Sequence, residues 1–196
     1  MLQLLSWLMM MPVFSGPASA LEYPAWVAAQ PVQAQPAGYR LLASAHRDLA
    51  ALSAEWPGVI TPFEIGRTVQ NRPIWGFRIR DPARPIRRKV LVFAGLHPFE
   101  WISTETALAV AESMAAHPVS GVEVVVPAVN IDRRLVVEAD QLVGRDVYRR
   151  TNMNGVDLNR DFGVHRDAVA IWRHLIPGFY QTSPAPLSQP ETQALD

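Results

Sequence analysis

The amino-acid sequence predicts an α/β fold in which a helix connects two parallel strands of one sheet. Two apolar runs, KVLVFA (89–94) and GVEVVVPAVN (121–130), are each typical of a strand that is buried on both faces. Between them, TETALAVAESMAAH (104–117) predicts a helix that is opened by Ser103 or Thr104. Strand, helix and strand in this order indicate parallel neighbours with a right-handed crossover.

The residues before these strands predict a helix followed by a β-hairpin. Apolar residues recur at helical spacing over residues 39–56, and a Pro-Gly pair ends that helix. VITPFEIG (59–66) and PIWGFRIR (73–80) each have a strand pattern, and the polar turn RTVQNR (67–72) joins them. This arrangement adds antiparallel strands to the predicted sheet.

Less regular patterns occupy the two ends of the chain. Residues 1–20 predict a secretory signal peptide, because a short apolar run is followed by the small-residue sequence SGPASA. The alternative is a short membrane anchor, since no Lys or Arg precedes the run. Residues 21–37 are rich in Pro, Ala and Gln and predict a linker. Near the other end, Ser188 and Glu191 form an S-x-x-E capping box that predicts a helix start.

The composition excludes several kinds of site. Lys and Arg total 18, equal to the 18 Asp and Glu, so charge gives no argument for nucleic acid or an anionic membrane as a partner. The chain has no cysteine, which excludes disulfides and thiolate chemistry. Any metal site must therefore use His, Asp or Glu.

A candidate metal pair follows the first buried strand, in GLHPFEWIS (95–103). Active sites of parallel α/β sheets lie outside the carboxyl ends of the strands. His97 and Glu100 are three residues apart, so they can point the same way, and both side chains are normal zinc ligands. The pair alone is a weak signal, because a capping glutamate beside a half-buried histidine has the same pattern.

Further motifs give this pair a context. Residues 130–162 show little periodicity and predict a functional loop, which includes YRRTNMNGVDLNRDF (148–162). With the upstream segments this stretch resembles the zinc metallocarboxypeptidases, whose motifs appear here in order as IGRTVQNRPI, GLHPFEW, PAVNID, RTNMNGVDLNRDF and PAPLSQPETQAL. The resemblance implies a mixed, mostly parallel sheet with helices on both faces. Residues 38–196 would be the N-terminal part of that catalytic domain, incomplete at its C-terminus.

The resemblance implies a site for one Zn²⁺ ion. His97 and Glu100 would be its first two protein ligands. Asp157 would hold His97 in orientation, since a metal-bound histidine usually donates its other N–H to an acceptor. An Asx-turn role is the alternative for Asp157.

The resemblance also implies a binding site for a peptide with a free C-terminal carboxylate. Arg150 would polarise the scissile carbonyl and stabilise its oxyanion. Asn159 and Arg160 would bind the terminal carboxylate, for which the planar guanidinium is suited. The alternatives are a solvated basic turn for Arg149 and Arg150, and a loop hydrogen bond for Asn159.

Three expected parts are not assigned in this sequence. The family's third zinc ligand, its glutamate that activates water and its substrate-contacting tyrosine would follow residue 196, so these 196 residues alone are expected to be inactive. His165 or His174 could replace the third ligand only if they completed a tetrahedral geometry. Phe99 stands where pancreatic-type relatives carry Arg, and Asp161 where the family usually has Asn.

The function expected from the sequence is that of a secreted or periplasmic zinc carboxypeptidase. It would hydrolyse the last peptide bond of a peptide or of a cell-wall stem peptide, without nucleic acid or, once the signal is removed, a membrane as partner. One alternative is an amidohydrolase of related fold that deacylates N-acyl amino acids. Another is a non-catalytic relic that binds carboxylates.

Overall fold

The computed structural model describes residues 38–118, 122–164, 166 and 180–196. The predicted signal peptide and linker, together with His165 and His174, lie outside these residues. Within the described part of the chain, no helix has the length and apolar character needed to cross a membrane.

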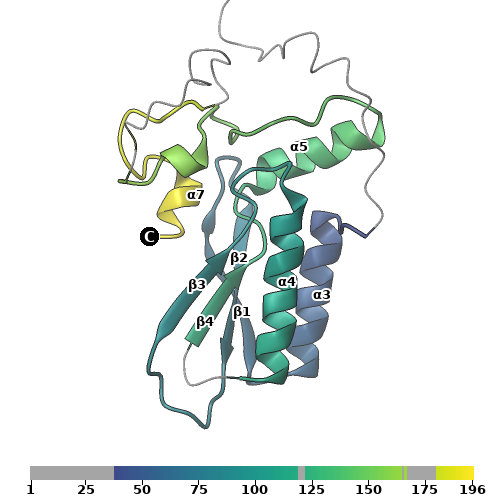
Figure 1. Cartoon of the computed structure of the whole chain (residues 1–196), viewed down its shortest axis with the longest axis vertical. Coiled ribbons are helices and arrows are strands. Elements are labelled where there is room, and N and C mark those ends of the chain that lie inside the picture. The colour runs from purple at the N-terminus through teal and green to yellow at the C-terminus, as the bar shows by residue number, and fades with distance from the viewer. Residues whose placement is uncertain (1–37, 119–121, 165, 167–179) are drawn as a thin grey trace, which may run out of the picture.

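A four-stranded mixed sheet forms the centre of the described chain (Figure 1). Its spatial order is β1-β2-β4-β3, with the bounds β1 Ile60–Arg67, β2 Pro73–Arg80, β3 Lys89–Phe93 and β4 Val122–Val126. The β1–β2 and β2–β4 pairs are antiparallel, and β3–β4 is parallel. The mixed α/β fold, the hairpin and the parallel pair are confirmed. Only one of these three pairings is parallel. The short turn that joins β1 to β2 forces those two strands to run in opposite directions.

Helices lie on both faces of this sheet. Helices α3 (Leu42–Glu55) and α4 (Trp101–Ala116) lie side by side against one face (Figure 1). The short helix α7 (Pro190–Gln193) lies on the other side and packs against β1. Gly66 makes this approach possible, because a Cβ at that position would lie 2.5 Å from the Cβ of Ala194.

Two clusters of buried apolar side chains form the core. The larger cluster lies between the sheet and the helices α3 and α4, and it includes Leu49 and Leu108. The second cluster joins Ile74 and Val126 to Leu158, which belongs to the polar loop that was singled out in the sequence. Burial of Leu158 therefore fixes this loop against the end of the sheet.

The predicted start of α4 is wrong by two to three residues. The helix begins at Trp101, and its N-cap residue Glu100 makes no side-chain cap hydrogen bond. The Ser103 hydroxyl instead donates to the Glu100 carbonyl at 2.7 Å and accepts from the Gly95 N–H at 3.1 Å. Ser103 thus links the helix to the preceding turn, since the backbone is already helical where the cap was expected.

A helix also occupies part of the segment predicted to be an irregular loop. Helix α5 covers Ile131–Leu142. Its periodicity is hidden in the sequence because many of the side chains on its buried face are polar. These buried polar residues are Asp132, Arg134, Glu138 and Asp140. Tertiary hydrogen bonds, rather than an apolar stripe, therefore hold much of this helix in place.

Strand β3 is not buried on both faces, contrary to the prediction. Leu91 and Phe93 are 41% and 40% exposed, and Val90 on the opposite face is 37% exposed. Among the described strands β3 has β4 as its one neighbour, so its other side is an edge. The apolar sequence of β3 therefore leaves an exposed apolar surface.

The predicted capping box before α7 does not form. Gln189 is the N-cap residue, and its side chain makes no cap hydrogen bond. The Glu191 carboxylate accepts from the Val69 N–H at 3.1 Å and from Asn152 Nδ2 at 3.1 Å. Glu191 is fully buried, and this burial raises its pKa. Glu191 therefore makes hydrogen bonds to residues distant in sequence instead of the expected capping box with Ser188.

Candidate active site

The candidate site lies at the edge of the sheet where the parallel strands β3 and β4 end. Just after β3 the chain turns at Gly95, whose φ of 66° and close approach to Ala128 both require glycine. Asn130, after β4, is fully buried and donates to the carbonyls of Leu96 (3.1 Å) and Thr151 (3.2 Å). Asn130 thereby joins the loop after β3 to the polar loop 148–162.

His97 is the centre of the polar contacts at this edge. Its Nδ1 lies 2.9 Å from Glu100 Oε1, and its Nε2 lies 3.0 Å from Asp157 Oδ1. The His97 side chain is buried, whereas that of Glu100 is 43% exposed. The structure thus brings the predicted metal pair together and places Asp157 on the opposite nitrogen of the same ring.

Asp157 connects most of the predicted site residues. Besides His97, its carboxylate accepts from Arg150 Nε at 2.7 Å and from the Asn159 N–H at 3.0 Å. Burial alone would raise the pKa of Asp157, but the hydrogen bonds from His97 and Arg150 outweigh it, and the pKa lies below its ordinary value. Asp157 is therefore an ionised acceptor, and its contact with Asn159 also makes it a local turn residue.

The adjacent residues Arg149 and Arg150 contact different partners. Arg149 pairs with Asp140 of α5. Arg150 donates to Asp157, and its NH1 lies 3.8 Å from Glu100 Oε1. The structure therefore places Arg150, rather than Arg149, beside the metal pair.

Asn159 and Arg160 lie on a single 3-10 turn, η1 (Leu158–Arg160). Asp157 precedes this turn as its N-cap and accepts from the Asn159 N–H. Arg160 NH1 donates to the Asn159 carbonyl in an exposed position. Both side chains therefore remain accessible at the rim of the site, one turn away from Asp157.

Sequence reasoning missed two residues of this region, Asn130 and Tyr180. Asn130 lies in the PAVNID motif, so its position after a buried strand was the available signal. Tyr180 gave no comparable signal. Its ring contacts Arg150 and Arg160 only because residues far apart in sequence meet here. Phe99, which stands where pancreatic-type relatives carry Arg, stacks on His97 with ring centroids 6.4 Å apart.

His97 and Glu100 have the chemistry of metal ligands. The ionised Asp157 can only accept, so Nε2 of His97 carries the proton. In the neutral ring Nδ1 then turns its lone pair toward the Glu100 oxygen 2.9 Å away. Two acceptors at this distance need a cation or a proton between them. The residues described here contain no group of three or more His, Asp or Glu side chains able to hold a metal ion, so this pair supplies only part of a coordination shell.

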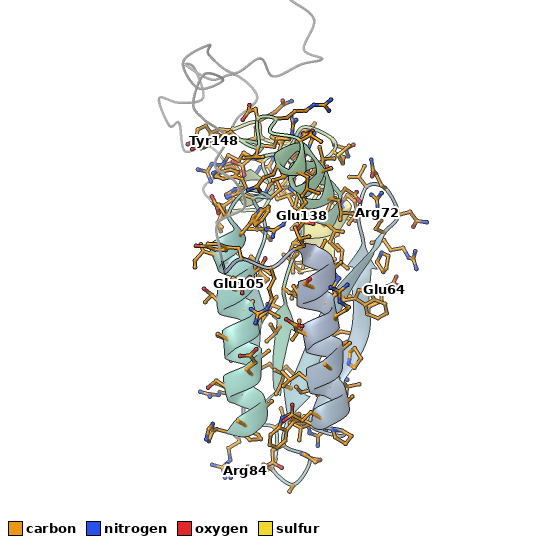
Figure 2. The ribbon with its side chains drawn as sticks, turned by 90° about the vertical axis from the view of Figure 1, so that its right-hand side faces the viewer. Glu64, Arg72, Arg84, Glu105, Glu138 and Tyr148 are labelled. Atoms are coloured by element: carbon orange, nitrogen blue, oxygen red, sulfur yellow. The ribbon has the colours of Figure 1, made fainter. Side chains whose placement is uncertain are left out.

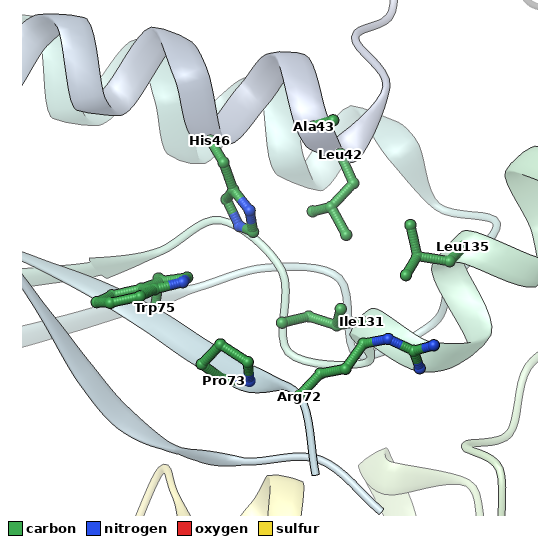
Figure 3. Close-up of a pocket in the computed structure, with 8 residues that line it drawn as sticks. All are labelled: Leu42, Ala43, His46, Arg72, Pro73, Trp75, Ile131 and Leu135. Atoms are coloured by element: carbon green, nitrogen blue, oxygen red, sulfur yellow. The ribbon is translucent and has the colours of Figure 1, made fainter. Parts of the chain in front are cut away.

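A separate pocket of about 240 Å³ lies between α3, β2 and α5 (Figure 3). His46, Trp75 and Leu135 are among the residues that line it, and none of the predicted site residues does. Burial lowers the pKa of His46, which favours its neutral form. His46 lines this pocket, and His117 is exposed at the far end of α4, so both lie away from the predicted site residues.

Residues 45–196 match the model of the zinc carboxypeptidase family, peptidase M14. The chain belongs to this family. Zinc carboxypeptidase A 1 of Drosophila melanogaster is similar at 27% identity over 162 residues, covering 75% of this chain and 37% of the relative. This zinc carboxypeptidase chain therefore spans well under half the length of that curated relative.

Solved structures share the fold of this zinc carboxypeptidase chain. Bovine thrombin-activatable fibrinolysis inhibitor, in complex with tick carboxypeptidase inhibitor, has a TM-score of 0.63 at 19% identity. The match covers 80% of this chain and 54% of that one. Carboxypeptidase A from Helicoverpa armigera has a TM-score of 0.61 at 23% identity, covering 80% and 41%. These likenesses establish the fold.

Proposed function

We propose that the protein containing this chain is an exported zinc carboxypeptidase, which removes the last residue from peptides with a free C-terminal carboxylate. The observation that carries the proposal is the contact of His97 with both Glu100 and Asp157, beside Arg150. Family membership supports the hydrolase chemistry. Export, to the periplasm or outside the cell, rests on the signal pattern of residues 1–20.

His97 and Glu100 would hold the zinc ion. Asp157 keeps the His97 ring in one tautomer and one orientation, which makes Nδ1 the nitrogen available to the metal. Zinc, when bound, supplies Lewis-acid polarisation of the scissile carbonyl. A third protein ligand and a general base would come from residues outside those that the structure describes.

Arg150 would meet the carbonyl oxygen of the scissile bond. Its Nε donates to Asp157, which fixes the plane of the guanidinium, and its NH1 lies 3.8 Å from Glu100 Oε1, beside the proposed zinc ligands. A donor held in advance at the developing oxyanion is worth about 10²- to 10³-fold in kcat. Only 11% of the Arg150 side chain is exposed, which strengthens its electrostatic effect.

Asn159 and Arg160 would bind the terminal carboxylate. Arg160 can donate two parallel hydrogen bonds to a carboxylate, and the Asn159 amide can add a third. Their place on one rigid turn, capped by Asp157, holds them at a fixed position relative to His97.

The decisive test is Arg160→Ala in the full-length, zinc-loaded protein. With N-acyl dipeptides that have a free C-terminal carboxylate, the loss of charge-assisted hydrogen bonds should lower kcat/KM about 10- to 100-fold, mainly through KM. Arg145→Ala is the matched control, because Arg145 is 74% exposed and pairs only weakly with Asp140.

Unaltered hydrolysis by the Arg160→Ala protein would show that the assignment of Arg160 is wrong. Preferential hydrolysis of N-acyl amino acids over peptides would favour the amidohydrolase alternative. Carboxylate binding without any turnover would favour the non-catalytic relic.

A further inference from the structure

One aromatic ring lies next to both arginines of the proposed substrate site. The guanidinium carbon of Arg150 is 4.8 Å from the ring centroid of Tyr180, and that of Arg160 is 5.8 Å from it. Both distances lie within the range of cation–π attraction, which extends to about 6 Å. Tyr180 is therefore the described side chain that touches both cationic groups.

The backbone beside Tyr180 is anchored to the same loop. The Gln181 carbonyl accepts from the Asp157 N–H at 2.8 Å, so the residue next to Tyr180 is hydrogen-bonded to the residue that orients His97 and Arg150. The Tyr180 ring is half-buried. The hydrogen bond of Gln181 therefore ties the backbone next to Tyr180 to the site.

Arg150 and Arg160 carry like charges, which affects how far apart their guanidinium groups lie. Two guanidinium groups on one side of a site repel each other and would spread apart if nothing held them. An aromatic ring near both guanidinium groups attracts each of them by about 0.5–2 kcal/mol, and the attraction is stronger where water is excluded. The one hydrogen bond described for the Arg160 side chain is exposed and goes to the neighbouring Asn159 carbonyl, so this attraction matters more for Arg160 than for Arg150.

We propose that Tyr180 is a positioning residue that sets the separation of Arg150 and Arg160. This inference rests on the proposed function. In a C-terminal substrate the scissile carbonyl and the terminal carboxylate are separated by a single amino-acid residue. The two guanidinium groups must therefore be held at one distance for both to be engaged. The Tyr180 ring fixes that distance, and so restricts cleavage to the last peptide bond.

The first measurement is spectroscopic and does not depend on activity. In full-length protein labelled with ¹⁵N-arginine, the ring current of Tyr180 should shift the Nε–Hε signals of Arg150 and Arg160. Tyr180→Phe keeps the ring and should leave both signals close to those of the wild type. Tyr180→Leu should move both signals towards the values of an arginine without an aromatic neighbour.

The second measurement is the ratio of kcat/KM for an N-acyl dipeptide acid to that for its C-terminal amide. Tyr180→Leu should lower this ratio about 3- to 30-fold, while Tyr180→Phe stays within about 2-fold of wild type. A purely structural role would lower thermal stability and leave the ratio unchanged.

If the wild type is active and Tyr180→Leu has the same acid-to-amide ratio as the wild type, the positioning role of Tyr180 is wrong but the proposed function stands. Unshifted arginine signals in the wild type would also show that the positioning role is wrong. A zinc-loaded wild type that hydrolyses neither substrate would overturn the proposed function, and the role of Tyr180 with it.

Discussion

Asp161 is fully buried and accepts hydrogen bonds from several donors of the C-terminal segment. These donors are the hydroxyls of Ser183, Ser188 and Thr192 and the N–H of Gln189. Burial alone would raise the pKa of Asp161, but these hydrogen bonds outweigh it and the pKa lies below its ordinary value. The carboxylate therefore fastens residues 183–192 to the loop that carries Arg160.

Asp161→Asn tests this role at the residue where the family usually has asparagine. The amide replaces one acceptor oxygen by a donor, which would face groups that already donate. We expect the free energy of unfolding at pH 7 to fall by about 1–3 kcal/mol, measured by chemical denaturation. Glu112→Gln, an exposed carboxylate on α4, is the control and should change stability very little.

The pH dependence gives a second readout of Asp161. Because its pKa is lower in the folded state, Asp161 stabilises the fold above the ordinary carboxyl pKa of about 4, and this stability is lost as pH falls through the folded pKa. The stability difference between wild type and Asp161→Asn should therefore shrink below about pH 4. A constant difference down to pH 2 would contradict this account.

At the scale of elements, α5 is docked through buried charges. Glu138, which is labelled in Figure 2, accepts from the Leu42 N–H at the start of α3 and from Arg134 Nε, both at 2.7 Å. The Arg134 guanidinium lies 3.9 Å from the Trp101 ring at the start of α4. Glu138 and Arg134 therefore connect three helices beside the candidate site.

Removal of Glu138 should be costly because it leaves Arg134 buried without its carboxylate. We expect Glu138→Ala to lower the free energy of unfolding by about 3–5 kcal/mol. Glu138→Gln keeps an acceptor for the Leu42 N–H and should lose less. Leu142→Ala, at a residue 74% exposed at the end of the same helix, should stay within about 0.5 kcal/mol. Equal losses in Glu138→Ala and Leu142→Ala would refute the docking role.

At the scale of the whole molecule, β3 presents exposed apolar side chains at an edge of the described sheet. Leu91 and Phe93 lie together on one face of an edge strand, and Phe93 contacts the ring of Phe162 at 6.4 Å. An exposed apolar edge strand is a template for pairing with another chain. We therefore expect the 196-residue chain to self-associate.

Leu91→Lys should reduce this association, since a charge on an edge strand opposes pairing. Light scattering after size exclusion, over a range of protein concentrations, should show a larger monomer fraction for Leu91→Lys than for the wild type. Ile102→Lys is the matched control, because Ile102 is 59% exposed on α4, away from the strand edge. If both variants raise the monomer fraction equally, the added net charge explains the effect and the edge strand does not.

The sequence by itself determined the β-hairpin, the β3–α4–β4 unit and the ordered motifs that mark the zinc carboxypeptidase family. It also singled out the residues at 97, 100, 150 and 157 that the structure brings into contact. These features are encoded locally, in apolar periodicity and in short spacings of chemically distinct side chains.

Only the tertiary structure decided that Arg149 pairs with Asp140, that α5 is a helix, and that Tyr180 lies next to both Arg150 and Arg160. It also decided that Glu191 binds Val69 instead of capping its own helix. Each of these outcomes depends on a polar or aromatic contact made outside the local pattern, in most cases with a partner distant in sequence. Such a contact leaves no period in the sequence, because its free energy arises only when folding has brought both partners together and removed water from between them.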